Sequence, residues 1–177
     1  MEMTGTELEE FYTDDSGAFT VGIALPEGGQ DLVIEGVDEQ GKRCGYFVMP
    51  ARLVRERRKG TPYLAKIARY MEYAEEHPYA AWYTPPAFPA APGEPLMTGL
   101  LRHVLESGEV IAVGIAEEEF PVTGIVRSFA KGAARIECID PETAEPSEEI
   151  RVRIRDIEYI EYGSIDNRLL QYAFEKA

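Results

Sequence analysis

Histidine and cysteine are the residues best suited to catalytic or metal chemistry, and the chain of 177 residues holds two of each. A histidine can act as a general base or a metal ligand, and a cysteine can act as a nucleophile. His77 lies in a proline-rich stretch and His103 lies among apolar residues. Cys44 and Cys138 stand alone, and neither residue type forms a recognisable metal or nucleophile motif. We therefore expect no enzyme activity, no catalytic residue, no metal site and no cofactor.

The most basic stretch, LVRERRKG at residues 53–60, raises a second kind of chemistry, the binding of phosphates. Arginine and lysine make most protein contacts with a nucleic-acid backbone. The candidate contacts are Arg52, Arg55, Arg57, Arg58 and Lys59. The alternative is a charged edge strand whose cations divide between its two faces.

Net charge favours the edge strand. The chain carries 18 basic and 32 acidic residues, a formal charge of −14, and both halves are acidic. Such a charge repels phosphate backbones and anionic membranes. We expect no DNA and no membrane partner, and RNA binding ranks second to a charged edge strand.

A proline-rich segment between His77 and Pro95 offers a possible partner-binding surface. Prolines recur there at every third position, which matches the three residues per turn of polyproline II. Such a ridge can dock on a partner, with the candidate residues Trp82, Tyr83, Pro86, Pro89, Pro92 and Pro95. The favoured alternative is a spacer whose aromatic side chains pack on the protein's own surface.

Three amphipathic helices and a series of strands must position these residues. Thr61 and Pro62 open the first helix, Gly108 ends the second and Ser164 caps the third. The second helix begins near Leu96. The remaining segments alternate apolar and polar residues, which is typical of antiparallel strands with one wet face.

An internal repeat relates the two halves of the chain. FTVGIALPEGGQDLVIEGVDEQ, from Phe19, aligns without a gap with PVTGIVRSFAKGAARIECIDPE, from Pro121. Gly22 then matches Gly124, and one residue inserted near Ser147 keeps the later positions in step. Beyond the insertion, Gly60 matches Gly163. The same order of strands, glycines and capped helix in both halves predicts two copies of one unit.

The second copy resembles the Sm-like (LSm) family, in which a helix and a glycine precede a strongly bent small barrel. Gly124, Val126 and Phe129 fit the family pattern of glycine, apolar residue and aromatic residue in the second strand. IRDIEYI loosely fits a later block through Ile154, Arg155, Ile157 and Ile160. The resemblance implies a mainly β fold of two tandem Sm-like or SH3-like five-stranded antiparallel barrels, each followed by an α-helix. It also implies assembly from strand to strand into rings or oligomers.

The RNA-binding residues of that family do not carry over. RNA-binding members have an aspartate and an asparagine after the second-strand aromatic, and FAKGAA has neither. Their later block holds a glycine and an asparagine that IRDIEYI lacks. The resemblance therefore supports the barrel and its assembly rather than the RNA pocket.

These observations predict a first barrel with its helix at 1–76, a linker at 77–95 and a second barrel with two helices at 96–177. We expect a non-catalytic protein-interaction or scaffold protein that binds a protein partner or forms a homo-oligomer. RNA binding through the basic last strand of the first barrel is the alternative. The acidic N-terminus lacks the apolar core of a signal peptide, so we expect a cytoplasmic protein.

Overall fold

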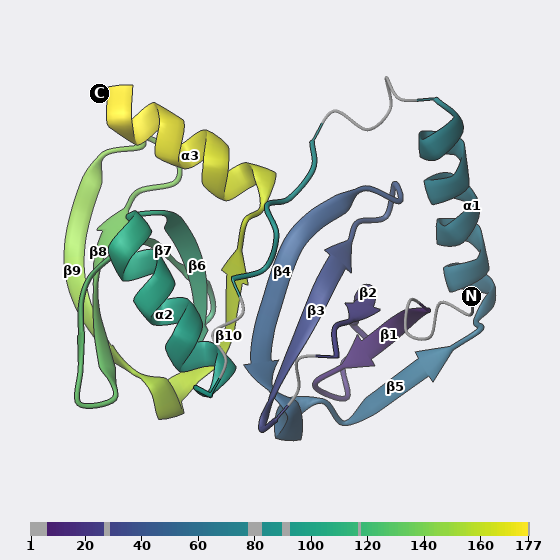
Figure 1. Ribbon diagram of the computed structural model, residues 1–177, viewed down its shortest axis with the longest axis horizontal. Helices are drawn as coiled ribbons and strands as arrows, with labels where there is room; N and C mark the ends of the chain where they lie inside the picture. The colour runs from purple at the N-terminus through teal and green to yellow at the C-terminus, as the bar shows by residue number, and fades with distance from the viewer. Residues whose placement is uncertain (1–6, 27–28, 78–82, 90–92, 117, 177) are drawn as a thin grey trace.

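The computed structural model describes residues 7–26, 29–77, 83–89, 93–116 and 118–176. The first half-sheet consists of β1 (Leu8–Tyr12), β2 (Thr20–Ala24), β3 (Asp31–Val37), β4 (Arg43–Pro50) and β5 (Glu56–Lys59). The second half-sheet consists of β6 (Val110–Ile115), β7 (Val122–Ala130), β8 (Ala133–Ile139), β9 (Pro146–Arg153) and β10 (Ile157–Tyr162). These strands form one antiparallel sheet in the order β5-β1-β2-β3-β4-β10-β6-β7-β8-β9 (Figure 1).

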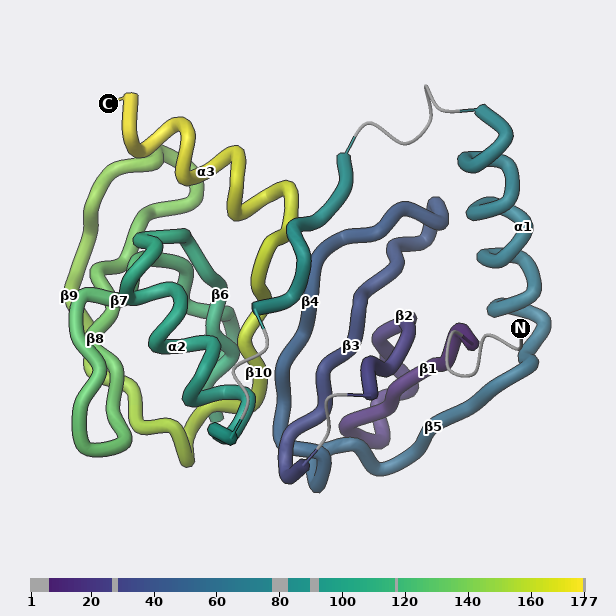
Figure 2. The backbone as a smooth tube through the Cα atoms, in the orientation of Figure 1, coloured from purple at the N-terminus to yellow at the C-terminus, as the bar shows by residue number. Residues whose placement is uncertain are grey.

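The prediction of two separate five-stranded barrels is wrong. A barrel would require β4 to close on its own half-sheet, but β4 instead pairs with β10 of the other half. The backbone trace shows β4 and β10 side by side at the centre of the molecule (Figure 2). We call the pairing of β4 with β10 the joint between the half-sheets. The physical reason for it is that both strands present apolar side chains there, so their pairing buries apolar surface and also satisfies backbone hydrogen-bonding groups.

The strand register confirms the internal repeat. In β3 and β4, Ile34 lies opposite Phe47, and in β8 and β9, Ile136 lies opposite Ile150. Positions up to β3 are thus related by an offset of 102 residues, and those from β4 onward by 103. The offset pairs Glu10–Val21 with Ala112–Thr123 and Phe11–Arg57 with Val113–Ile160, as observed. The single inserted residue lies in the turn before β9.

Three α-helices among the described residues begin where their sequences predict, and the second also ends at the predicted glycine. They are α1 (Pro62–Glu76), α2 (Leu96–Ser107) and α3 (Ile165–Lys176). Thr61 Oγ1 accepts a hydrogen bond from Leu64 N at 3.2 Å, and Ser164 Oγ accepts one from Asn167 N at 3.2 Å. Gly108 ends α2 in the left-handed conformation, with φ 71°. Short 3₁₀ turns, η1 (Ala51–Leu53) and η3 (Ile154–Asp156), precede β5 and β10.

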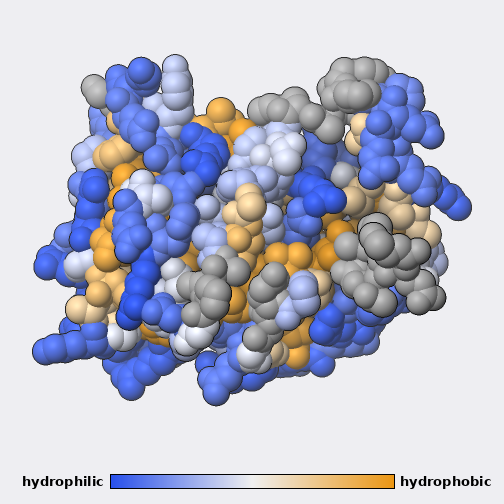
Figure 3. Space-filling view, in the orientation of Figure 1, coloured by the Kyte–Doolittle hydropathy of each residue, from blue (hydrophilic) through white to orange (hydrophobic). Residues whose placement is uncertain are grey.

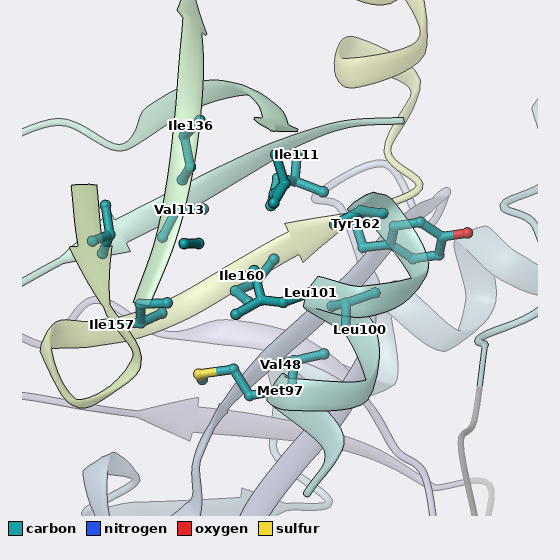
Figure 4. Close-up of a cluster of buried hydrophobic side chains, with 14 of the residues drawn as sticks. Val48, Met97, Leu100, Leu101, Ile111, Val113, Ile136, Ile157, Ile160 and Tyr162 are labelled. Atoms are coloured by element: carbon teal, nitrogen blue, oxygen red, sulfur yellow. The ribbon is translucent and has the colours of Figure 1, made fainter. Parts of the chain in front are cut away.

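The largest hydrophobic cluster crosses the joint between the half-sheets. Helix α2 contributes Met97, Leu100 and Leu101, which pack with Val48 of β4 and Ile160 of β10 (Figure 4). The cluster also extends over the second half-sheet. A core shared in this way ties the two half-sheets together through side chains as well as through the strand ladder.

Helices α1 and α3 occupy equivalent places on their half-sheets. Ile67 of α1 packs with Val37, and the equivalent Leu170 of α3 packs with Ile139. Each helix therefore covers its own half-sheet, α1 at the right of the molecule and α3 from the end of β10 toward the upper left (Figure 1).

Two equivalent glycines allow neighbouring strands to approach closely. A Cβ on Gly22 would collide with the carbonyl oxygen of Glu35, and one on Gly124 would collide with that of Glu137. Both obstacles are backbone atoms of the adjacent strand, which cannot swing aside as a side chain can. The mid-strand glycines noted in the repeat are thus required by packing.

No helix in the described part of the chain combines the length and apolar character needed to span a membrane.

Candidate functional sites

The basic run lies at one end of the sheet, where β5 is the terminal strand. All four residues of β5 are exposed. Arg57 and Lys59 reach toward β1, whereas Arg58 pairs along its own strand with Glu56. Arg55 directly precedes β5, and Arg52 lies in the preceding turn η1. The five cations are thus spread over a turn and both faces of an edge strand.

Carboxylates already neutralise most of these cations. Arg57 donates two hydrogen bonds to Glu9, at 2.8 and 2.6 Å. Arg58 donates two to Glu56, at 2.7 and 2.9 Å, and these bonds lower the pKa of the Glu56 carboxyl. Arg55 donates one to Asp15 at 2.8 Å. A phosphate would have to displace these partners, which weakens the case for a nucleic-acid surface.

The described part of the proline-rich segment packs on the protein's own sheet. The Tyr83 hydroxyl donates a hydrogen bond to the carbonyl of Gly163 at 2.6 Å. Phe88 lies 5.3 Å from Tyr46, between ring centroids, and joins the cluster at the joint. Pro86 is half-buried beside Gly163. These contacts agree with the favoured interpretation of the segment as a packed spacer.

The other candidate residues of the segment are spread along it. Pro89 is half-buried, and Pro95 is exposed where it precedes α2. Trp82 and Pro92 lie outside the described residues. The described prolines therefore do not present one continuous exposed ridge.

The two histidines lie at separate helices. His77 caps the end of α1, stacks on Tyr73 at 4.1 Å, and its Nδ1 lies 2.9 Å from the Tyr73 carbonyl oxygen. His103 on α2 has its Nε2 3.1 Å from Glu109 and 3.3 Å from the Tyr162 hydroxyl. No group of residues among those described could hold a metal ion.

Glu109 is the centre of a polar cluster that the sequence did not suggest. It pairs with Arg168 of α3 and accepts hydrogen bonds from Tyr162 at 3.2 Å and from Ser107 at 2.9 Å. Partial burial raises the carboxyl pKa, but the Ser107 hydrogen bond and the Arg168 charge outweigh it, and the net pKa falls below its usual value. Burial and the Glu109 charge raise the pKa of Tyr162 to about 12. The cluster joins α2, β10 and α3, which is a structural role.

Burial disfavours the thiolate form of both cysteines. Burial, and secondarily Asp38, raise the pKa of Cys44 to about 12. Burial also raises the pKa of Cys138. Because the thiolate is the nucleophilic form, neither residue is prepared for catalysis.

A groove runs between α1 and strands β1 and β2. This α1 groove has a volume of about 420 Å³, and its lining includes Glu7, Leu8, Ile23, Ala65, Ala68 and Met71. Glu72 and Glu75 of α1 stand beside it. In the space-filling view, α1 forms a largely hydrophilic ridge at the upper right of the molecule (Figure 3). The groove therefore has an apolar floor, acidic sides and no basic lining residue among those described.

The other half of the molecule has side chains where the α1 groove is open. By the repeat, Ala65 and Ala68 of α1 correspond to Arg168 and Gln171 of α3. Arg168 forms an ion pair with Glu109, the equivalent of Glu7. Gln171 Oε1 accepts a hydrogen bond from Val110 N at 3.3 Å, and Val110 is the equivalent of Leu8. The long side chains of Arg168 and Gln171 thus correspond to two alanines in α1, and this difference leaves the α1 groove open.

A second hollow of about 340 Å³ lies between the C-terminal half of α1 and β4, and it shares Met71 and Glu75 with the α1 groove. Cys44, Met71, Ala74 and Ile165 contribute to its lining. Its charged residues are mixed, Asp38 and Glu75 with Lys42 and Arg43. This mixture selects no particular class of ligand, unlike the acidic α1 groove.

Comparisons with known proteins give no relative: no protein-family model, no curated protein and no solved structure matches the chain.

Proposed function

We propose that this protein is a non-catalytic protein-interaction protein that binds an apolar segment bearing a basic side chain in the α1 groove. One observation carries the proposal. The groove is open, whereas the equivalent space in the other half is filled. There Arg168 forms an ion pair with Glu109, and Gln171 accepts a hydrogen bond from a backbone amide. The equivalent site thus indicates the chemistry that a partner would supply.

The charge of the groove favours a basic partner. Glu7 corresponds to Glu109, which holds Arg168 in the other half. Among the described residues, Glu7 pairs with one cation, the Lys59 ammonium at 3.2 Å, and both side chains are more than half exposed. Glu72 and Glu75 take part in no ion pair within the described residues. An arginine or lysine entering the groove would therefore meet carboxylates on both sides.

The floor of the groove favours an apolar segment. Leu64 is buried, whereas Met71, one turn beyond Ile67, is only partly covered. A volume of about 420 Å³ falls in the usual range of ligand pockets. A short amphipathic segment, with apolar side chains on the floor and a cation at the rim, meets both requirements.

The charge of the whole chain supports the same partner class. A formal charge of −14 accelerates the approach of a basic ligand and slows that of an acidic one. The same charge, together with the paired cations of β5, disfavours RNA as the partner.

The experiment is an anisotropy titration with a fluorescein-labelled designed helical peptide that has leucines on one face and lysines on the other. We expect saturable binding by the full chain. A peptide with glutamates in place of the lysines should not bind. Equal binding of the two peptides, or no binding of the lysine peptide, would contradict the proposal.

A self-filling variant, in which side chains of the protein itself occupy the α1 groove, tests where the peptide binds. Ala65→Arg with Ala68→Gln places in α1 the side chains that fill the equivalent space beside α3. We expect this variant to lose at least about tenfold in affinity for the lysine peptide, equivalent to 1.4 kcal/mol. Ala173→Arg adds the same charge at an exposed position of α3 and should bind like the wild type. Unchanged affinity in the self-filling variant would remove the α1 groove as the site.

A further inference from the structure

The repeat allows each residue at the central joint to be compared with its equivalent at the two ends of the sheet. At the joint, Val48 of β4 lies opposite Ile160 of β10, and Tyr46 lies opposite Tyr162. All four side chains are buried in one cluster. The equivalent of β4 is β9, and the equivalent of β10 is β5. These two strands are the terminal strands of the sheet.

On the β9 side, charged residues replace the apolar ones. The equivalent of Val48 is Arg151, and that of Tyr46 is Glu149, as the shared register of β3–β4 and β8–β9 establishes. Val33 of β3, also buried at the joint, corresponds to Arg135 of β8. Arg135 pairs with Glu149, and all three charged side chains are exposed.

On the β5 side, the same replacement occurs. The equivalents of Ile160 and Tyr162 are Arg57 and Lys59. Ile111 of β6, fully buried at the joint, corresponds to Glu9 of β1. Glu9 is buried and pairs with both cations. Six apolar residues at the joint thus correspond, by the repeat, to six charged residues at the two ends of the sheet.

A second copy that repeated the joint at an end would place like charges together. The register of β4 with β10 would set Arg151 of one copy opposite Arg57 of the next. Arg135 would lie beside Arg151 in the same row. Like charges directly opposite each other in a sheet are destabilising, and Glu149 opposite Lys59 offsets only part of that. Charged side chains on terminal strands are a known means of preventing edge pairing.

We propose that the repeated unit associates through the strand pairing seen at the joint between β4 and β10. The six charges prevent the outer edge strands, β5 and β9, from pairing with another copy in the same way. The protein then contains one complete pair of units and stays monomeric, because further copies do not add to its edge strands. This proposal replaces the homo-oligomer expected from the sequence, which rested on the Sm-like resemblance and its strand-to-strand assembly. It does not depend on ligand binding in the α1 groove, although Lys59, one of the six, also pairs with Glu7 at the rim of that groove.

The first test measures the mass of the full chain by light scattering after size-exclusion chromatography, over concentrations from micromolar to millimolar. We expect the mass of one chain throughout. A mass that rises toward two or more chains with concentration would overturn the proposal.

The second test determines whether the charges are the cause. One variant restores the apolar residues on the β5 side, with Glu9→Ile, Arg57→Ile and Lys59→Tyr. The other restores them on the β9 side, with Arg135→Val, Glu149→Tyr and Arg151→Val. Each variant alone should remain one chain, and an equimolar mixture should double the mass. Far-ultraviolet circular dichroism checks that both variants are folded.

If both folded variants stay separate in the mixture, charge is not what closes the edges and the proposal is wrong. Helix α2, which covers the central joint, would then be the element that the outer edges lack. If either variant doubles its mass without the other, association does not follow the β4–β10 joint, and the proposal is equally wrong.

Discussion

Val48 and Ile160 lie directly opposite each other across the two halves of the chain, and both side chains are 0% exposed. They are more than 100 positions apart in the sequence, yet they form the centre of a continuous sheet. Burying side chains of this size contributes roughly 1.5–3 kcal/mol each. The pair therefore contributes to the free energy that holds the half-sheets together.

Shortening this pair should destabilise the fold. We expect Ile160→Ala to lower the free energy of unfolding by about 2–5 kcal/mol, because it removes buried methyl groups and leaves a cavity. Urea denaturation measures the change. Arg151→Ala, at the exposed position equivalent to Val48, is the matched control and should stay within about 0.5 kcal/mol of the wild type. Similar losses in both variants would contradict a buried joint.

Alanine at either mid-strand glycine should also destabilise. In Gly22→Ala and Gly124→Ala the new methyl group meets a carbonyl oxygen of the neighbouring strand. We expect each to cost about 1–3 kcal/mol, the usual range for overpacking. Thermal melts of the two variants should show similar shifts, because the sites are equivalent. Gly29→Ala, where a Cβ meets nothing within 4 Å, should leave the melting temperature nearly unchanged.

The Glu109 cluster predicts a loss of stability in acid. Its carboxyl pKa is lower in the folded protein than the ordinary value of 4.5, so the folded state favours the carboxylate. The stabilisation is complete above the unfolded pKa and is lost as pH falls through the lower folded pKa. Urea denaturation of the wild type and Glu109→Gln from pH 7 to pH 3 measures this. The difference between them should shrink toward low pH, and a constant difference would contradict the prediction.

The cysteines should resist modification until the protein unfolds. A rise in the pKa of Cys44 from 9.0 to about 12 reduces its thiolate fraction by about a thousandfold. Reaction with a thiol reagent at pH 8 should therefore be slow in buffer and fast in urea, and buried Cys138 should behave in the same way. Rapid labelling of the folded protein at Cys44 would show that its surroundings are open.

RNA binding by β5 should be weak. Filter binding to mixed single-stranded RNA at low salt should show no saturation at micromolar protein, because Arg57 and Arg58 are already paired with carboxylates. Micromolar affinity that falls steeply with added salt would instead indicate phosphate contacts.

The sequence predicts the local structure and the repeat correctly. Thr61, Gly108 and Ser164 mark helix ends because capping is decided by a few neighbouring residues. The alignment of Gly22 with Gly124, and of later positions beyond one insertion, agrees with the observed register because the strands of each half pair in the same order.

What the sequence does not reveal is which strands meet over long distances. Whether β4 closes on its own unit or pairs with β10 depends on which edge offers an apolar partner, and alternation alone is the same in both cases. The α1 groove is hidden for a similar reason. Ala65 and Ala68 are ordinary helix residues until Arg168 and Gln171 are seen to fill the equivalent space.

Amide hydrogen exchange at the strands of the joint tests the continuous sheet most directly. Both β4 and β10 are interior strands here, so the amides of Val48 and Ile160 should be protected as strongly as those of β3 and β6. Amides of β5 and β9 that face outward should exchange much faster. If β4 and β10 exchange as fast as the terminal strands, the two half-sheets are not joined and the account is wrong.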